Sequence, residues 1–102
     1  AVLMARYDLF RNPSGNGYLL DVQADLLSEL NTRVVAPLLP HVAGMKIVRK
    51  LNPTFVIDGE QYVMFTHLLA TVPMSRLTEP RANFLNHQDD ILGALDMLFQ
   101  GF

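Results

Sequence analysis

The fold is decided first by the stretch LDVQADL at residues 20–26, where apolar and polar side chains alternate without interruption. The apolar residues, at even positions, share one face of an extended chain, and the polar residues share the other. This pattern predicts a half-buried strand. Residues 5–10 carry a similar alternation, and the turn-forming run NPSGNG at 12–17 separates the two. We therefore expect the two runs to form an antiparallel hairpin.

A second hairpin is predicted around Asp58-Gly59, which separates the strand-like runs 54–57 and 60–65. Asp-Gly between two such runs favours a two-residue turn. That turn would pair Ile57 with Glu60 and Phe55 with Tyr62.

Residues 34–39 are apolar on both faces of an extended chain. We expect a strand there that is either central in the sheet or covered by a partner. Pro37 cannot donate to a strand ladder and therefore indicates an edge or a bulge. The weakly patterned residues 41–50 are expected to form a loop or small flap. Residues 68–72 predict one more strand, closed by Pro73.

Only the end of the chain has a helical pattern. Asn86 is the expected N-cap, and Asp89 and Asp90 would lie in the first turn, where acidic side chains favour the helix dipole. One apolar stripe recurs at i, i+3, i+4 and i+7, and Gly101 lies where a glycine commonly ends a helix. The stripe consists of Ile91, Ala94, Leu95 and Leu98.

Strands that precede a single helix predict a mainly β, α+β fold: a small antiparallel barrel with one C-terminal α-helix against it. We expect one domain over residues 1–102. Met4 is the expected natural start, with residues 1–3 a remnant ahead of it; alternatively, they extend the first strand. The expected core or interface residues are Leu20, Val22, Phe55, Val63, Leu95 and Leu98.

Composition narrows the classes of function. The net charge is −2, so the chain lacks the basic surface that a general nucleic-acid binder needs. It contains no cysteine, which excludes disulfides and thiolate metal sites and suits the cytoplasm. No apolar run reaches the roughly 20 residues that cross a bilayer, so no membrane association is expected.

No catalytic constellation is recognisable, and we expect neither enzymatic activity nor a cofactor. Of the three histidines, only His87 has a possible metal co-ligand nearby, Asp90, and two ligands do not make a site. The position of both at the helix start already accounts for them. We expect no metal site.

Two features of the C-terminal region favour a binding function. Gly93 lies in the middle of the helix, where glycine costs about 1 kcal/mol relative to alanine. It belongs either to a plain solvent-facing side with a close backbone contact or to a binding surface. Two aromatic residues, Phe99 and Phe102, lie among the last four residues. They either fold back onto the core or form a binding tip.

Five blocks of the sequence resemble the CcdB family of toxins. They are LDVQADLL at 20–27, TRVVAPL at 32–38, MFT at 64–66, ATVP at 70–73 and ALDMLFQGF at 94–102. Together they keep the order and spacing of the family from about residue 6 to the end.

The resemblance implies an SH3-like barrel with a small flap and a C-terminal helix, assembled as a homodimer. It implies a cytoplasmic toxin that binds the A subunit of DNA gyrase and traps the enzyme on cleaved DNA. A small CcdA-like antitoxin would neutralise it by folding a disordered tail onto it. Toxin and antitoxin together would repress their own operon, so contact with DNA would be indirect.

By position, the resemblance places the gyrase contacts in two segments. The first holds Ala24, Leu26 and Leu27, and the second holds Asp96, Phe99, Gln100, Gly101 and Phe102. In the best-known members a tryptophan stands at the position of Gln100, an isoleucine at Phe102 and an asparagine at Asp96. The tryptophan stacks on a gyrase arginine, which Gln100 cannot do. Either the affinity is lower here, or Asp96 pairs with the arginine instead.

Two alternatives stay open. One is an endoribonuclease toxin of the MazF and Kid type on the same fold, which would need a basic groove and a converging Arg with an acid or His. The other is a relic that binds antitoxin and regulates its operon but no longer poisons gyrase.

Overall fold

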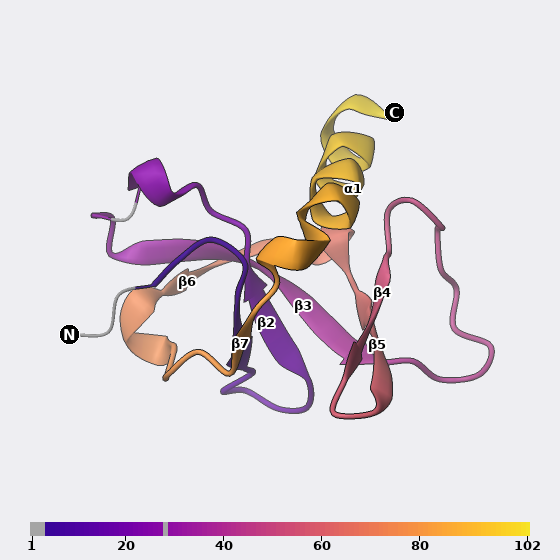
Figure 1. Cartoon of the computed structure of the whole chain (residues 1–102), viewed down its shortest axis with the longest axis horizontal. Coiled ribbons are helices and arrows are strands. Elements are labelled where there is room, and N and C mark those ends of the chain that lie inside the picture. The colour runs from indigo at the N-terminus through magenta and orange to yellow at the C-terminus, as the bar shows by residue number, and fades with distance from the viewer. Residues whose placement is uncertain (1–3, 28) are drawn as a thin grey trace.

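The computed structural model describes residues 4–27 and 29–102. The expectation for residues 1–3 lies outside this range. An antiparallel sheet of seven strands curls into a half-barrel, and one helix stands against it (Figure 1). The elements are β1 (Asp8–Arg11), β2 (Tyr18–Asp21), β3 (Thr32–Pro40), β4 (Thr54–Ile57), β5 (Glu60–Met64), β6 (Ala70–Pro73), β7 (Ala82–Asn83) and α1 (Gln88–Gln100). The predicted fold class, a small α+β barrel with a C-terminal helix, is confirmed.

The strand order is β4-β5-β3-β2-β1-β7, with β6 also paired to β3. β3 is therefore central: β2 lies along one side, and β6 and then β5 lie along the other. Both predicted hairpins form. In the second, Ile57 pairs with Glu60 and Phe55 with Tyr62, as the Asp58-Gly59 turn predicts. Both turn residues have positive φ, 52° and 82°, which this tight turn requires.

Both faces of the central strands are covered. Leu20, Ala36 and Leu38 belong to a cluster that also holds Ile91 and Ala94 of α1. On the opposite face, a smaller cluster consists of Phe10, Leu19, Val35 and Leu77, with Met4 and Val72 packed against it. The apolar run 34–39 is thus explained by its central position, and no second molecule is needed to cover it.

Of the six expected core residues, four are buried and two are partly exposed. Leu20, Val22, Phe55 and Val63 are buried. Leu95 is half-buried and packs against the main cluster, and Leu98 is half-buried as well.

The prediction of a strand over 20–26 is wrong beyond Asp21. β2 ends there, and Asp25–Leu27 form a 3₁₀ turn with no buried residue. The two polar residues Asp21 and Gln23 are buried rather than solvated, whereas Ala24 and Leu26 are exposed. Alternation failed here because both polar side chains find partners inside the protein: Asp21 pairs with Arg33 on the next strand, and the Gln23 amide bonds to backbone groups.

Three smaller expectations also differ from the structure. Asn86 is not the N-cap: it lies in a 3₁₀ turn, Leu85–His87, and α1 starts after His87 with no side-chain cap. The strand expected at 68–72 is β6 at Ala70–Pro73, since Thr66–Leu68 form another 3₁₀ turn. Pro37 does not lie at an edge of the sheet, because β3 has strands on both sides. It falls where the neighbour of β3 changes from β6 to β5, and its carbonyl accepts a bond from Phe65 N–H at 2.8 Å.

The loop between β3 and β4 follows the prediction of a flap, with no helix or strand over residues 41–53 (Figure 1). The Asn52 side chain, which is 3% exposed, holds its end in place. Its Oδ1 accepts a bond from Val48 N–H at 3.0 Å, and its Nδ2 donates to Met64 O at 3.1 Å.

A buried ion pair joins β2 to β3. Arg33 Nε donates to Asp21 Oδ2 at 2.6 Å, and neither side chain is exposed to solvent. Burial raises the pKa of the Asp21 carboxyl, and the Arg33 guanidinium opposes that shift by its hydrogen bond and its charge. Arg33 also donates from Nη2 to Gln23 O at 3.5 Å, while its Nη1 has no partner in the described residues.

Breaking this pair from one side should be strongly destabilising. Arg33→Met leaves the Asp21 carboxylate buried without its partner, so we expect the free energy of unfolding to fall by about 3–5 kcal/mol in urea denaturation. The double variant Arg33→Met with Asp21→Leu removes both charges and should recover most of that loss. A single-variant loss under about 1 kcal/mol would show that Asp21 finds water or another partner.

Candidate partner-binding groove

The structure brings the two predicted site segments to the walls of one groove. The groove has a volume of about 510 Å³ and runs between the 3₁₀ turn after β2 and the last turns of α1. Ala24 and Leu27 line it from the turn, and Asp96 and Phe99 line it from α1. Residues about 70 positions apart in the sequence thus meet at one surface, because α1 packs against the same apolar cluster as the end of β2.

The other lining residues connect the two segments. They are Arg6, Val22, Gln23, Leu30, Thr32, Val34, Leu69, Thr71, Leu92 and Leu95. The sequence reasoning assigned none of them to the site. Leu92 and Leu95 could have been found, since they lie seven and four positions before the predicted contact Phe99, in the pattern i, i+3, i+7 on one side of α1. Arg6 and Leu30 carry no local signal, because tertiary packing alone places them there.

The groove is mainly apolar, and among its lining residues only Arg6 and Asp96 are charged. Large apolar side chains also project around it. Leu26 is 92% exposed and Phe99 71% exposed. Exposed apolar side chains that adjoin an apolar groove are typical of a protein–protein interface.

The remaining predicted residues lie at the tip of the helix. Gln100 ends α1, and Gly101 follows with a φ of 81°, the left-handed conformation in which glycine commonly ends a helix. Phe102 is 78% exposed, so the two terminal aromatics do not fold back onto the core. Leu26, Gln100, Gly101 and Phe102 do not line the groove itself.

A second groove, of about 380 Å³, adjoins the first. Phe102 and Asp96 line it together with Gly93, Asp89 and Asp90 of α1, and the flap contributes Arg49 and Lys50. Asp96 therefore borders both grooves and is exposed. Its carboxylate is open to a cationic group on a partner.

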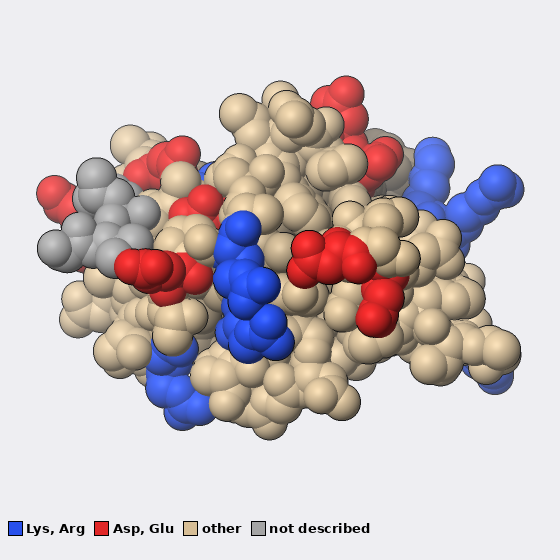
Figure 2. All heavy atoms as spheres, turned by 60° about the horizontal axis from the view of Figure 1, so that its bottom comes forward, with Lys and Arg blue, Asp and Glu red and all other residues tan. Residues whose placement is uncertain are grey.

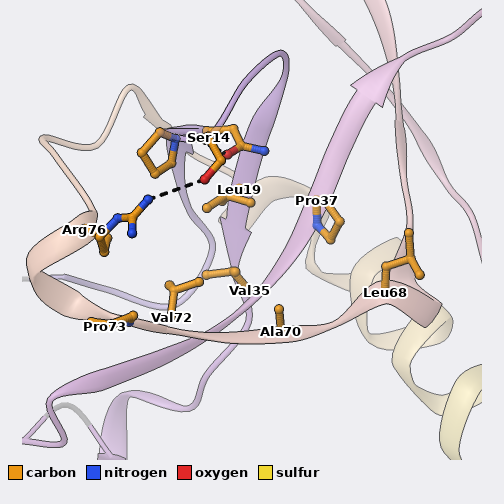
Figure 3. Close-up of a pocket in the computed structure, with 11 residues that line it drawn as sticks. Ser14, Leu19, Val35, Pro37, Leu68, Ala70, Val72, Pro73 and Arg76 are labelled. Atoms are coloured by element: carbon orange, nitrogen blue, oxygen red, sulfur yellow. Dashed lines mark hydrogen bonds between the residues drawn. The ribbon is translucent and has the colours of Figure 1, made fainter.

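None of the eight predicted residues lines a third hollow, whose own lining residues are drawn in Figure 3. It is formed by the turn before β2 and by residues of β2, β3 and β6, among them Leu19, Val35 and Val72. At one end Arg76 Nη2 donates to Ser14 Oγ at 3.4 Å. The hollow offers an apolar surface but shares no residue with the groove beside α1.

Charges on the surface are dispersed. Figure 2 shows acidic and basic side chains interspersed over one face, without an extended basic patch. Within residues 4–27 and 29–102, no three His, Cys, Asp or Glu side chains gather in a way that could hold a metal ion. In the same part of the chain, no helix has the length and apolar character to cross a membrane.

Comparison with solved structures defines the class of fold. The structure of an Mtb toxin matches with a TM-score of 0.70 at 16% sequence identity, covering 89% of this chain and 99% of that one. At this identity the match establishes the fold. The sequence itself matches the family model described as CcdB protein over residues 6–101. The chain therefore belongs to the CcdB family of toxin–antitoxin toxins.

Gly93 has no structural role in the folded chain that alanine could not fill. It is exposed, and a Cβ built on it meets nothing within 4 Å. The expected close backbone contact is therefore absent within the described chain. We predict that Gly93→Ala raises the free energy of unfolding by about 0.5–1 kcal/mol, because alanine favours the helix. Chemical denaturation measures this directly, and a decrease in stability would contradict it.

Proposed function

We propose that this chain is the toxin of a type II toxin–antitoxin pair that binds the A subunit of DNA gyrase and traps the complex of gyrase with cleaved DNA. One observation carries the proposal: Ala24, Leu27, Asp96 and Phe99, which the resemblance assigns to gyrase contact, line a single apolar groove. The chain acts by binding the cleaved-DNA state better than the other states of gyrase, which shifts the enzyme toward that state. No catalytic group of the chain takes part.

The chemistry of the groove suits a partner with apolar side chains and one cation. Leu26, Leu27 and Phe99 supply the apolar contacts, and Asp96 supplies the negative charge between the two grooves. A charge-assisted bond from an arginine to Asp96 would replace the aromatic stacking that Gln100 cannot provide. Direct nucleic-acid contact is less well supported, because the groove has one basic side chain and the net charge is −2.

Family membership implies an antitoxin partner. We propose that a CcdA-like antitoxin neutralises the chain by folding a disordered tail onto its apolar surface, and that the complex represses the operon. Such a tail loses entropy on binding and compensates with buried apolar contacts. Failure of the cognate tail to bind the purified toxin in a titration would contradict this part of the proposal.

The decisive experiment measures binding of the purified chain to the dimerisation region of the gyrase A subunit, together with gyrase-mediated DNA cleavage. Binding with stabilised cleavage supports the poison. Binding of antitoxin without gyrase would identify the relic. Cleavage of purified RNA, with no effect on gyrase, would identify the ribonuclease.

Three variants test the C-terminal tip. Removing residues 100–102 should lower gyrase affinity at least tenfold, or about 1.4 kcal/mol, and abolish growth inhibition. Gln100→Trp should strengthen binding by on the order of 1 kcal/mol if it stacks on a partner arginine. Asp96→Ala should weaken binding, because it removes the carboxylate. Gyrase affinity and melting temperature are measured for each variant.

The fold should survive the truncation, since Gln100, Gly101 and Phe102 are all exposed. Val56→Ala is the matched control: Val56 is 67% exposed on β4 and lines neither groove beside α1, so its loss should leave gyrase affinity unchanged. Full toxicity of the truncated, folded protein would refute the role of the tip.

We further propose a homodimer. The central position of β3 removes one reason to expect it, but the family resemblance still implies it, and the large side chains of Leu68 and Leu85 are exposed outside the proposed gyrase contacts. Sedimentation at micromolar concentration should show a species of twice the 11.5 kDa chain mass. A single 11.5 kDa species under those conditions would exclude a stable dimer.

A further inference from the structure

The side chain of Gln23 joins two segments of backbone at the base of the groove. It is 7% exposed. Its Nε2 donates to Leu27 O at 3.1 Å, and its Oε1 accepts a bond from Val34 N–H at 3.1 Å. One amide group thus ties the end of the 3₁₀ turn Asp25–Leu27 to the central strand β3.

The backbone of Gln23 is held by the buried ion pair. Its N–H donates to Asp21 Oδ1 at 3.0 Å, and its carbonyl accepts from Arg33 Nη2 at 3.5 Å. Gln23 cannot shift without disturbing the Asp21–Arg33 pair. In such a buried network each polar group depends on the bonds of the others.

Apart from Gln23, a few bonds within the described part of the chain fix the turn, and its residues add no apolar burial. Residues 24–27 are all exposed, and none belongs to either core cluster. A single 3₁₀ turn has poor internal hydrogen bonds, and ordering its residues costs conformational entropy. Arg6 donates from its backbone N–H to Asp25 Oδ1 at 2.7 Å and from Nε to Val22 O at 3.1 Å. In the backbone, Leu27 N–H donates to Ala24 O at 3.0 Å and Leu30 N–H donates to Leu27 O at 3.1 Å, so exchange of these two amides reports on the turn.

We propose that Gln23 is a positioning residue for the groove: its two backbone hydrogen bonds hold the turn that presents Leu26 and Leu27 beside α1. Gln23 acts through this turn rather than by contact with the partner. The identity of the partner as gyrase rests on the function proposed above, whereas the positioning of the turn does not.

Two substitutions separate this role from general stability. Gln23→Met keeps the length of the side chain and removes both hydrogen bonds. Gln23→Glu keeps an acceptor for Val34 N–H but loses the donor to Leu27 O. It replaces the methionine variant in the experiment if that variant folds poorly. Both should lower affinity for the gyrase A dimerisation region at least tenfold. Both should also speed amide exchange at Leu27 and Leu30 at least tenfold relative to the amides of β3.

The matched control is Asn52→Leu. Asn52 is also a buried side-chain amide that bonds to two backbone segments, but it fastens the flap instead of the turn. This variant should lower the melting temperature while leaving exchange at Leu27 and Leu30 at wild-type values.

If the wild-type chain does not bind gyrase, the proposed function is wrong, and exchange at Leu27 and Leu30 alone decides the positioning role. Unchanged exchange in both Gln23 variants overturns the inference. So does faster exchange at Leu27 and Leu30 that Asn52→Leu shares at an equal melting temperature, because the effect would then be general destabilisation. Faster exchange confined to the turn of the Gln23 variants supports it.

Discussion

The buried ion pair between Asp21 and Arg33 is the interaction on which the rest of the structure depends. It fixes β2 against β3, the one strand that contacts three others. Burying two charges is costly, and a short ionic bond with additional hydrogen bonds offsets part of that cost, although Arg33 Nη1 has no partner in the described residues. The same pair directs the chain as it leaves β2. By bonding to the backbone of Gln23, it turns the following residues out of the sheet and toward the end of α1.

The apolar core and the eight predicted contact residues are therefore separate sets of residues, and a small polar network joins them. The apolar clusters on the two faces of the sheet contain none of the eight predicted contact residues. Those residues lie on the surface, on a turn and a helix end whose backbones are set by the core beneath them. The core also contributes to the groove directly, because Val22 belongs to the main apolar cluster and lines the groove. The surface position of the predicted contacts explains how Gln100 can occupy a position where the best-known relatives carry tryptophan while the fold stays the same.

Local chemistry made much of the fold predictable, and tertiary chemistry explains the failures. The register of β4 and β5 follows from Asp58-Gly59 alone, because a two-residue turn permits a single pairing. The end of α1 at Gly101 likewise follows from local backbone preference. The extent of β2 does not follow from local preference. An alternating pattern predicts that Asp21 is solvated, because the pattern contains no information about Arg33 on another strand. The two site segments were located only by resemblance. Their meeting in one groove depends on how α1 packs, which no local pattern specifies.

The pairing of β7 with β1 bears on how the chain is made. Asn83 bonds to Asp8, 75 positions earlier in the sequence, and α1 comes later still. On the ribosome, β1 must wait for this partner until most of the polypeptide has emerged. Contacts so distant in sequence slow folding. The helical wall of the groove is synthesised well after β2, so a nascent chain presents the turn after β2 long before it can offer a complete surface to any target.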